Sequence, residues 1–470
     1  MRILALVCLS SLVWLAGCAS TGAANPALPA AARPASAVVP SSGSAAAAQP
    51  AADTHQALHP GGELLPIAVA QAASRVVTQL VPPADLWERI RRGYGMPNLE
   101  SSLVHDRERW YSGRPDYILR MTERSRKYLF HIVEELERRN MPTELALLPF
   151  IESAFNPQAV STAKAAGMWQ FIPATGKTFE LKQNAFRDDR RDVLASTRAA
   201  LDYLQKLHAM FGDWHLALAS YNWGEGSVGR AIAKNQRAGL GTAYTDLNMP
   251  METRFYVPKL QAVKNIVSDP AAFNSRLPNI ENHPYFQTVD IKHDIDVALA
   301  AKLAEVALAD FKALNPSANR PVILAAGTPQ ILLPWDNAAI FQSNLEAYTG
   351  GRLASWTVWL APTTMKPADA ARRAGMTEQA LRSVNNIPPR VVIKAGSSLL
   401  VPRSPHLETD VALHLADHGQ LSLASDGASK RSTRKAGKPG PQSKGGKGKK
   451  KPGSATLRTK NSKPVRTVKR

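Results

Sequence analysis

Cysteine is nearly absent from this chain of 470 residues: only Cys8 and Cys18 occur, both among the first 20 residues. The rest of the chain therefore cannot hold an intramolecular disulfide framework or a cysteine-based metal site. With 44% hydrophobic residues, the chain is long enough for two or three compact domains. A small disulfide-stapled scaffold is thus excluded.

Acidic residues are missing from 430–470, which carries 16 Lys or Arg. Subtracting these from the formal net charge of +20 leaves +4 for the other 429 residues. The strongly basic balance is therefore a property of a tail and does not indicate a nucleic-acid-binding domain. We interpret 427–470 as a basic disordered tail.

Large apolar residues are scarce over 19–60, where Ala, Pro and Ser dominate. Such a segment cannot bury enough surface to fold, so we predict a flexible N-terminal tether. Before it, a positive Arg2, an apolar run from Ile3 to Ala16 and small residues ahead of Cys18 predict a secretory signal. The run is too short and too early to indicate a membrane span.

The order Leu15-Ala16-Gly17-Cys18 resembles the bacterial lipobox. The resemblance implies that 1–18 is a lipoprotein signal peptide with lipobox and that Cys18 becomes the acylated first residue of the mature protein. Acyl chains on a terminal cysteine anchor a protein to a bilayer without spanning it. Ala19 follows where an Asp is typical of retention in the inner membrane, so the resemblance favours the outer membrane. The alternative is an ordinary signal peptide with an incidental cysteine.

Apolar residues recur at helical spacing through the middle of the chain. The stretch from Met121 to Arg139 shows this spacing, and Thr197 to Phe211 keeps Ala200, Leu204, Leu207 and Phe211 on one face. The stretch from Trp214 to Ser220 is apolar on nearly all sides, which predicts a buried helix. The body of the chain is therefore expected to be mainly α-helical.

A weak internal repeat follows about Pro284. Residues 300–316 and 322–334 are echoed by 368–387 and 391–402, with Asn315 matched by Asn385 and Gly327 by Gly396. Each unit is predicted to contain a first strand (285–291 or 355–360), two short helices, a loop ending in Gly and a β-rich run closed by Pro334 or Pro402.

This β-α-α-β order resembles the LysM module, which recognises glycans containing N-acetylglucosamine. We therefore expect a degenerate LysM-like unit at 284–345 and a LysM-like glycan-binding unit at 354–403. The Gly-Asp that usually opens the first helix is Ala361-Pro362 in the second unit. The alternative is two small α/β modules that only pack on the main domain.

Glu152 is the candidate for acid catalysis because it ends an apolar run, Leu145, Leu147, Leu148, Phe150 and Ile151, and precedes Phe155. A carboxyl group in apolar surroundings is poorly hydrated when ionised, so its pKa rises and it keeps a proton near neutral pH. The alternative, from polarity alone, is a glutamate at a helix end that points into water.

Two downstream clusters suit a sugar, which has apolar faces and polar edges. Gly167-Met168-Trp169-Gln170 places an amide beside two bulky apolar side chains. The segment 220–226 combines a hydroxyl, an amide and two aromatic rings with glycines that allow close backbone approach. Either cluster alone fits a core segment with a turn, but the two together favour a sugar site.

Four segments in this order resemble the lytic murein transglycosylases with a lysozyme-like (SLT) domain, in particular the membrane-bound D type. They are Glu152-Ser153, 167–173 (GMWQFIP), 220–222 (SYN) and 252–259 (ETRFYVPK). The likeness runs from about Leu86 to Val267, and more loosely through the second LysM-like unit. It implies an SLT domain at 85–270. One departure is Ser220, where the family usually has Ala.

The resemblance implies cleavage of the bond between N-acetylmuramic acid and N-acetylglucosamine in peptidoglycan, with Glu152 as catalytic acid and base. The residues implied to bind substrate are Ser153, Met168, Gln170, Tyr221, Asn222 and Tyr256. The implied architecture is a mainly α, lysozyme-like catalytic domain followed by small α/β LysM-like modules, with a disordered tether before it and a disordered tail after it.

A glycosidase normally uses two carboxylates. The other acid in the matched segments is Glu252, which has Arg254 beside it and no apolar run before it, so we interpret it as a solvated or paired structural carboxylate. The acids at 188, 189 and 192 fit an N-terminal helix cap with arginine partners at 190 and 191. Glu225 lies outside the matched segments.

If Glu152 works alone, it must give a proton and then take one back from a substrate hydroxyl. In muramic acid the 6-hydroxyl can close on C1, which ends the reaction without water. This makes the expected enzyme a lyase that forms 1,6-anhydromuramic ends and needs neither a metal nor an organic cofactor.

Two other functions remain open: a non-catalytic peptidoglycan-binding lipoprotein scaffold, and a lysozyme that hydrolyses with a remote second acid. The expected partners are peptidoglycan glycan strands and, through the lipid anchor at Cys18, a membrane; nucleic acid is not expected. The expected location is the outer membrane, facing the periplasm. The tail is either a solvated extension or a segment that binds wall carboxylates or anionic lipid.

Overall fold

The computed structural model describes residues 83, 85–404 and 409–426, and every structural statement below refers to these. The predicted signal peptide with Cys18, the tether at 19–60 and the tail at 427–470 lie outside the described residues. None of the described helices is long and apolar enough to cross a membrane.

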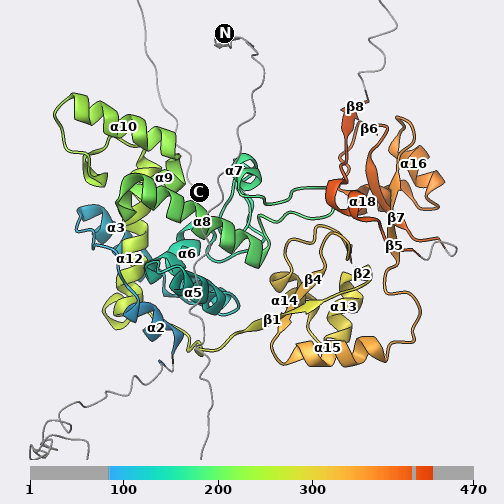
Figure 1. Ribbon diagram of the computed structural model, residues 1–470, viewed down its shortest axis with the longest axis horizontal. Coiled ribbons are helices and arrows are strands. Elements are labelled where there is room, and N and C mark those ends of the chain that lie inside the picture. The colour runs from blue at the N-terminus through green and yellow to red at the C-terminus, as the bar shows by residue number, and fades with distance from the viewer. Residues whose placement is uncertain (1–82, 84, 405–408, 427–470) are drawn as a thin grey trace, which may run out of the picture. The chain divides into compact units, whose positions relative to one another are not determined.

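The first part of the described chain, up to residue 273, contains helices and no strand (Figure 1). Its α-helices are α2 (Leu86–Arg92), α3 (Ser102–Ser112), α4 (Pro115–Ser125), α5 (Leu129–Arg138), α6 (Leu148–Ser153), α7 (Pro173–Thr178), α8 (Val193–Phe211), α9 (Trp214–Trp223), α10 (Glu225–Arg237), α11 (Met251–Arg254) and α12 (Tyr256–Ser268). Short 3₁₀ helices occur at Thr143–Leu147, Tyr244–Asp246 and Ala271–Phe273. We call 85–273 the helical region.

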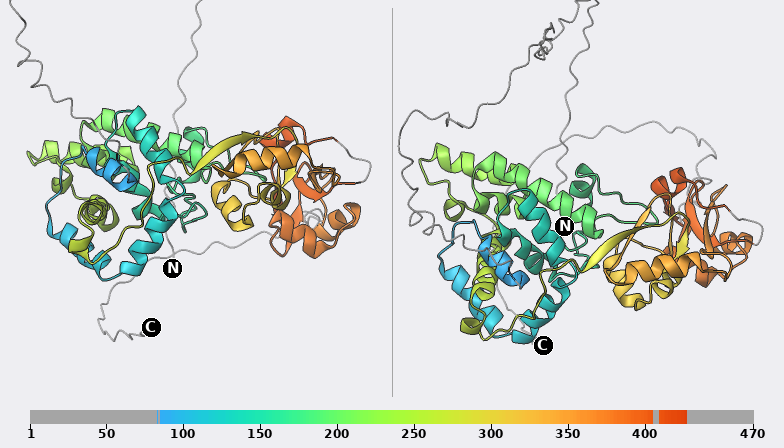
Figure 2. Two further views of the ribbon diagram at one scale, coloured as in Figure 1. Left: turned by 90° about the horizontal axis from the view of Figure 1, so that it is seen from below. Right: turned by 60° about the horizontal axis from the view of Figure 1, so that its bottom comes forward.

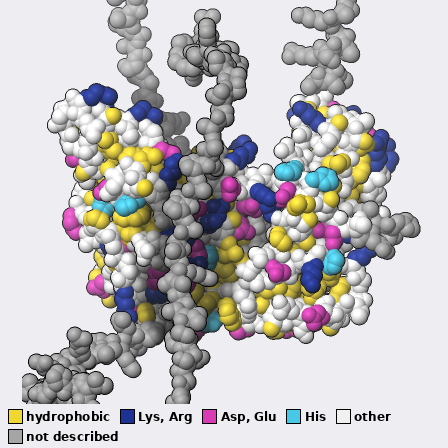
Figure 3. Space-filling model, viewed as in Figure 1, with side chains coloured by type: hydrophobic (Ala, Val, Ile, Leu, Met, Phe, Trp, Pro, Cys, Tyr) yellow, Lys and Arg dark blue, Asp and Glu magenta, His cyan; other side chains and the backbone are white. Residues whose placement is uncertain are grey.

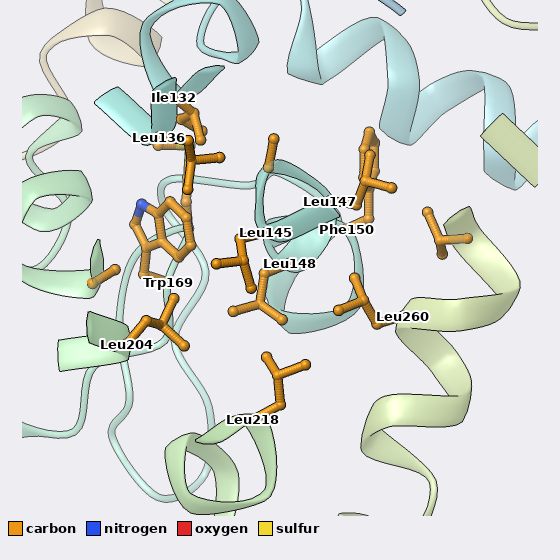
Figure 4. Close-up of a cluster of buried hydrophobic side chains, with 14 of the residues drawn as sticks. Ile132, Leu136, Leu145, Leu147, Leu148, Phe150, Trp169, Leu204, Leu218 and Leu260 are labelled. Carbon is orange, nitrogen blue, oxygen red and sulfur yellow. The ribbon is translucent and has the colours of Figure 1, made fainter. Parts of the chain in front are cut away.

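The helical region is built around helix α12, which packs against α2, α3, α6 and α9. Figure 4 shows the core beside it, where Leu145, Leu147, Leu148 and Phe150 meet Leu260 of α12. The apolar run before Glu152 is therefore buried. The core holds the short helix α6, and with it Glu152, in a fixed place.

Two predicted helices are confirmed. Helix α8 buries Ala200, Leu204 and Leu207 on one face, and Asp192 caps its N-terminus by accepting hydrogen bonds from Leu194 N (3.1 Å) and Ala195 N (2.9 Å). This is the capping role predicted for the acid-rich turn. Helix α9 contains the predicted buried stretch, with 216–220 all buried.

The helix predicted from Met121 to Arg139 is wrong as one element, because it is split into α4 and α5 by a turn at 126–128. Near the end of α4, the side chain of Thr122 donates to Ile118 O (2.8 Å) and that of Ser125 donates to Thr122 O (2.6 Å). Such side-chain bonds compete with the helical backbone ladder. The helical spacing correctly identified the buried face, since Tyr128 and the apolar residues of α5 are buried.

The second part of the described chain contains two similar units, and its strands and helices are visible in yellow to red in Figure 1 and from other sides in Figure 2. The first unit comprises β1 (Phe286–Asp290), β2 (Ile295–Asp296), α13 (Val297–Leu303), α14 (Leu308–Leu314), β3 (Val322–Ile323), β4 (Gln330–Pro334) and α15 (Asn337–Glu346). The second comprises β5 (Trp356–Leu360), α16 (Pro367–Arg373), α17 (Glu378–Asn385), β6 (Val391–Ile393), β7 (Ser398–Pro402), α18 (Leu413–His418) and β8 (Leu423–Ser425).

The structure confirms the predicted β-α-α-β order in both units. Strand β1 pairs antiparallel with β4, with Phe286 opposite Pro334, and β5 pairs antiparallel with β7, with Trp356 opposite Pro402. The repeated asparagines also have equivalent contacts. Asn315 exchanges two hydrogen bonds with the backbone of Leu332, both 2.8 Å, and Asn385 exchanges two with Leu400, at 2.9 and 2.7 Å.

Charged side chains of both signs are intermixed on the face drawn in Figure 3. This distribution fits the small net charge that the sequence leaves outside the basic tail.

We predict that Asn385→Ala loosens the second unit, because it leaves the N–H and C=O of Leu400 without their side-chain partner in a buried strand. An unsatisfied buried group costs about 1–3 kcal/mol. Hydrogen exchange at the Leu400 amide should become faster, and Asn315→Ala should do the same at Leu332. The exposed Ser383 provides the control, since Ser383→Ala should leave both amides protected. Unchanged exchange in Asn385→Ala would show that the side chain does not hold the strand.

Candidate active site

A cleft of about 540 Å³ lies in the helical region and is lined by residues from all four matched sequence segments. Glu152 comes from α6, Gln170 from the loop before α7, Tyr221 and Asn222 from α9, and Tyr256 from the start of α12. The cleft volume is in the range of small-molecule sites. Five of the seven residues predicted for catalysis or substrate binding therefore line one cavity.

The Glu152 carboxyl is partly exposed to the cleft and otherwise enclosed by protein. Its Oε1 accepts a hydrogen bond from the Tyr256 hydroxyl. Burial raises the pKa of Glu152 to about 7, while the Tyr256 hydrogen bond and the positive charge of Lys259 lower it and the charge of Glu252 raises it. The predicted rise of the pKa is confirmed, and at neutral pH the carboxyl can both give and accept a proton.

Two tyrosines of the cleft, Tyr221 and Tyr256, remain protonated across the physiological range. Burial raises the pKa of Tyr221 and of Tyr256 well above the usual value, and the nearby Glu152 carboxylate raises both further. Tyr221 donates its hydroxyl hydrogen to the backbone oxygen of Trp169 (2.9 Å). The Tyr256 hydroxyl therefore stabilises the Glu152 carboxylate by a hydrogen bond, and the Tyr221 hydroxyl bonds to the loop that carries Gln170.

That loop depends on Gly167, whose φ is +84° and whose backbone lies against the carbonyl of Arg190. A Cβ at this position would lie 1.9 Å from Arg190 O, so no other residue fits without a backbone shift. Gln170 also has a positive φ, of 50°, and its Nε2 donates to Gly167 O (2.8 Å). The loop thus presents Gln170 to the cleft in a conformation held by its own backbone.

Asn222 is positioned by a residue that sequence analysis did not single out. Its Oδ1 accepts a hydrogen bond from Thr253 Oγ1 (2.8 Å), and Thr253 is buried. This bond fixes the amide orientation, which leaves the Nδ2 group as its donor. The last two matched segments therefore meet at this contact.

Two predicted substrate-binding residues, Ser153 and Met168, are not among the residues that line the cleft. The Met168 side chain is fully buried and packs in the core. The Ser153 side chain is half-buried, and its hydroxyl donates to Met168 O (3.0 Å) and accepts from Asn156 N (3.2 Å). Both residues are adjacent to cleft residues in sequence, but Met168 is buried in the core and the hydroxyl of the half-buried Ser153 is bonded to the backbone.

The cleft is also lined by charged and aromatic residues outside the seven predicted for catalysis or substrate binding: Tyr203, Trp223, Glu252 and Lys259. Glu252 is exposed, as a solvated carboxylate should be, but it lines the cleft, and no ion pair involves it within the described chain. Its place so close to Glu152 was not evident because the two residues are 100 positions apart. Glu225 lies outside the cleft lining and accepts from the Tyr203 hydroxyl (2.7 Å).

We predict that Tyr256→Phe moves the pKa of Glu152 above about 7, because the lost hydrogen bond stabilised the ionised form. Titration of the ¹³C-labelled Glu152 carboxyl by NMR measures this directly. Lys259→Gln should also raise the pKa, whereas Glu252→Gln should lower it.

The matched control is Tyr203→Phe, since the Tyr203 hydroxyl contacts Glu225 and not Glu152. A pKa of Glu152 that is the same in Tyr256→Phe as in the unmodified protein would contradict the role assigned to this bond.

Comparison with known proteins agrees with this geometry. The family model of the transglycosylase SLT domain matches residues 131–240, and that of the LysM-like domain of lytic transglycosylase MltD matches 285–350. The second match falls on the first of the two small units, which sequence analysis had treated as the degenerate one.

Membrane-bound lytic murein transglycosylase D from Escherichia coli strains K12 and O6:H1 is 36% identical to this chain over 269 residues. The match covers 57% of this chain and 60% of the relative, so the chain matches about three fifths of the length of these relatives. A protein of Alteromonas sp. (strain M-1), named for tributyltin chloride resistance, is 50% identical over 111 residues, which are 23% of this chain and 54% of that protein. The chain thus carries a transglycosylase SLT domain followed by a LysM-like domain of the type named for lytic transglycosylase MltD.

Proposed function

We propose that this protein is a peptidoglycan lytic transglycosylase that cleaves the bond between N-acetylmuramic acid and N-acetylglucosamine and leaves 1,6-anhydromuramic ends. The proposal rests on the Glu152 carboxyl, which lies in the cleft and has a pKa of about 7. The SLT-domain match and the similarity to lytic murein transglycosylase D support the reaction class.

The first step uses Glu152 as an acid. Its carboxyl proton passes to the glycosidic oxygen, the bond from that oxygen to C1 of muramic acid breaks, and the N-acetylglucosamine fragment leaves with the proton. Positive charge develops at C1, while Glu152 is now a carboxylate. The Tyr256 hydroxyl, which donates to Glu152 Oε1, stabilises that carboxylate.

The second step uses the same carboxylate as a base. It takes the proton of the 6-hydroxyl of muramic acid, and the oxygen forms a new bond to C1. The proton count is restored, no water is consumed and Glu152 returns to its acid form. A single group with a pKa near neutrality suits both steps, because neither protonation state is strongly disfavoured.

The remaining cleft residues are proposed to bind sugar. The amides of Gln170 and Asn222 can pair with acetamide and hydroxyl groups, and Tyr221 and Trp223 offer aromatic surface for the apolar faces of the rings. We propose that the two LysM-like units bind N-acetylglucosamine in the same strands and keep the catalytic cleft near its substrate.

Hydrolysis is the competing reaction, and Glu252 is the group that could support it. Its carboxylate lies in the cleft and is open to solvent, so it is placed to activate a water molecule. Glu252→Gln separates the two routes, since the transglycosylase needs only Glu152 and keeps its activity, whereas a two-carboxylate hydrolase loses it.

We predict that digestion of purified peptidoglycan yields fragments with 1,6-anhydromuramic ends, each lighter by one water than the hydrolytic product. Glu152→Gln should lower kcat/KM by about 10²–10⁴-fold, because the amide cannot deliver a proton. Wall binding by sedimentation should persist in this variant. Mass spectrometry of the fragments provides the readout.

Three outcomes are informative. Reducing ends in place of anhydro ends would indicate hydrolysis and would turn attention to Glu252. Full activity in Glu152→Gln would contradict the assigned catalyst. Peptidoglycan binding without cleavage by either form would support the scaffold function.

We further propose that the protein is held at the outer membrane, facing the periplasm, by acylation of Cys18. Support comes from the lipobox-like residues before Cys18 and from the similarity to a relative named as membrane-bound. Cys18→Ala should then move the protein from the membrane fraction to the soluble fraction or block its processing. A variant that still sediments with membranes and is released only by detergent would place the anchor elsewhere.

A further inference from the structure

A second cavity of the described chain is separate from the catalytic cleft and has a volume of about 760 Å³. Its lining comes from three places: the α4–α5 turn with residues 155–158 and Arg191 of the helical region, residues 309–321 of the first small unit, and 383–386 of the second. All of these belong to one compact unit of the chain. We call this cavity the basic pocket.

The charge of the basic pocket has one sign. Five cationic side chains line it, and no Asp or Glu does: Arg124, Lys127, Arg191, Lys312 and Arg320. Lys127 is paired with Asp310 (2.6 Å). Among the described residues, no carboxylate lies within ion-pair distance of the other four. An unneutralised group of cations in a concave site attracts anions.

Two of the cations, Arg191 and Arg320, are held in place by neutral hydrogen-bond partners. Arg320 donates to the backbone oxygens of Ala185 (2.7 Å) and Val384 (2.8 Å). Arg191 donates to the side-chain oxygens of Gln158 and Asn319, each at 3.3 Å. These contacts join the helical region to both small units, so the pocket is formed before any ligand arrives.

The turn between α4 and α5 also makes contacts with the first small unit at the pocket wall. The Tyr128 hydroxyl donates to Ala313 O (2.9 Å), and Lys127 reaches Asp310 from the same turn. The turn that splits α4 from α5 therefore supplies the contact that closes one side. The break between α4 and α5 thus places Lys127 and Tyr128 in the pocket wall.

The neutral lining indicates what kind of anion fits. Side-chain amides line the pocket at Asn156, Gln158, Asn319 and Asn386, and the buried Phe155 and Pro157 lie between them in the wall. Amide groups donate and accept hydrogen bonds, as peptide groups do. A small inorganic anion would use convergent donors at one point, whereas cations and amides spread over this volume suit an extended peptide with several carboxylates.

The basic pocket also adjoins the catalytic cleft along the chain. Residues 155–158 follow Glu152 directly after the end of α6, and Arg191 follows the carbonyl against which Gly167 packs. The segment that supplies Ile151 and Glu152 to the cleft therefore continues into the pocket wall.

We propose that the basic pocket binds carboxylate-bearing peptides, namely the peptide stems attached to muramic acid in peptidoglycan. The identity of the peptide rests on the proposed function, whereas the site itself rests on the charges and amides above. Binding of stems here would make the protein sensitive to whether the glycan strand carries free acidic peptides.

The test is calorimetric titration of the full chain at low salt with a soluble tripeptide of alanine, glutamate and diaminopimelate. The wild-type chain should bind it, and the same peptide with amidated carboxylates should not bind. The double variant Arg124→Gln with Lys312→Gln should bind about five- to tenfold more weakly, the range expected for two partly exposed ion pairs. Both side chains are exposed, so the variant should fold.

The matched control is Lys302→Gln with Arg237→Gln, which removes the same charge from exposed positions outside both cavities. Its affinity for the tripeptide should equal that of the wild type. No binding by the wild type, equal affinity in both double variants or equal binding of the amidated peptide would overturn the proposal. Inorganic phosphate that displaces the peptide at equal concentration would also overturn it, by reducing the pocket to a general anion site.

This experiment does not depend on glycan cleavage. Peptide binding by a chain that releases no anhydro fragments would refute the proposed function and leave the basic pocket in place. Cleavage without peptide binding would do the opposite.

Discussion

The carboxyl group of Glu152 must be kept largely away from water and yet remain open to a ligand, and the structure around the cleft meets both demands. The apolar residues before it are in the core, which fixes α6, and the helix ends one residue later. Two consecutive residues with positive φ, Ala154 and Phe155, then turn the chain away. Burial alone would make the carboxylate form costly, and the Tyr256 hydroxyl together with Lys259 offsets part of that cost. The result is a group that can hold or release a proton near neutral pH.

The segment around Arg190 links this site to the rest of the chain. The Arg190 guanidinium is paired with Asp188 (2.7 Å) and donates to Phe171 O (3.2 Å). The Arg190 carbonyl packs closely against the backbone of Gly167. The same segment bonds to the first unit through Asp188 N to Ser317 O (3.0 Å) and to the second through Ala185 N to Gly419 O (2.9 Å). A substitution in this segment would therefore alter both the loop that carries Gln170 and the contacts between the helical region and the small units.

The two small units contain the same asparagine–strand contact. In each, an asparagine at the end of the second helix satisfies both the N–H and the C=O of one residue in the last strand. This fixes the helix against the strand with a single side chain and explains why Asn315 and Asn385 recur at matching positions. The sequences around the two asparagines differ, so the two units contact the helical region through different residues.

The basic pocket is lined by residues from both units, among them Arg320 from the first and Asn386 from the second.

Local sequence patterns determined much of this protein. The amphipathic face of α8, the buried helix α9, the Asp192 cap and the β-α-α-β repeats depend on contacts within a few residues or on periodicity, so they could be predicted. The raised pKa of Glu152 followed from an apolar run next to it in the chain. Tertiary structure alone decided which side of a segment faces the cleft: Met168 faces the core, while Glu252, Lys259 and Tyr203 reach the cavity from distant helices. It also decided the basic pocket, because its cations come from segments up to 196 residues apart, from Arg124 to Arg320, and only the folded chain brings them together.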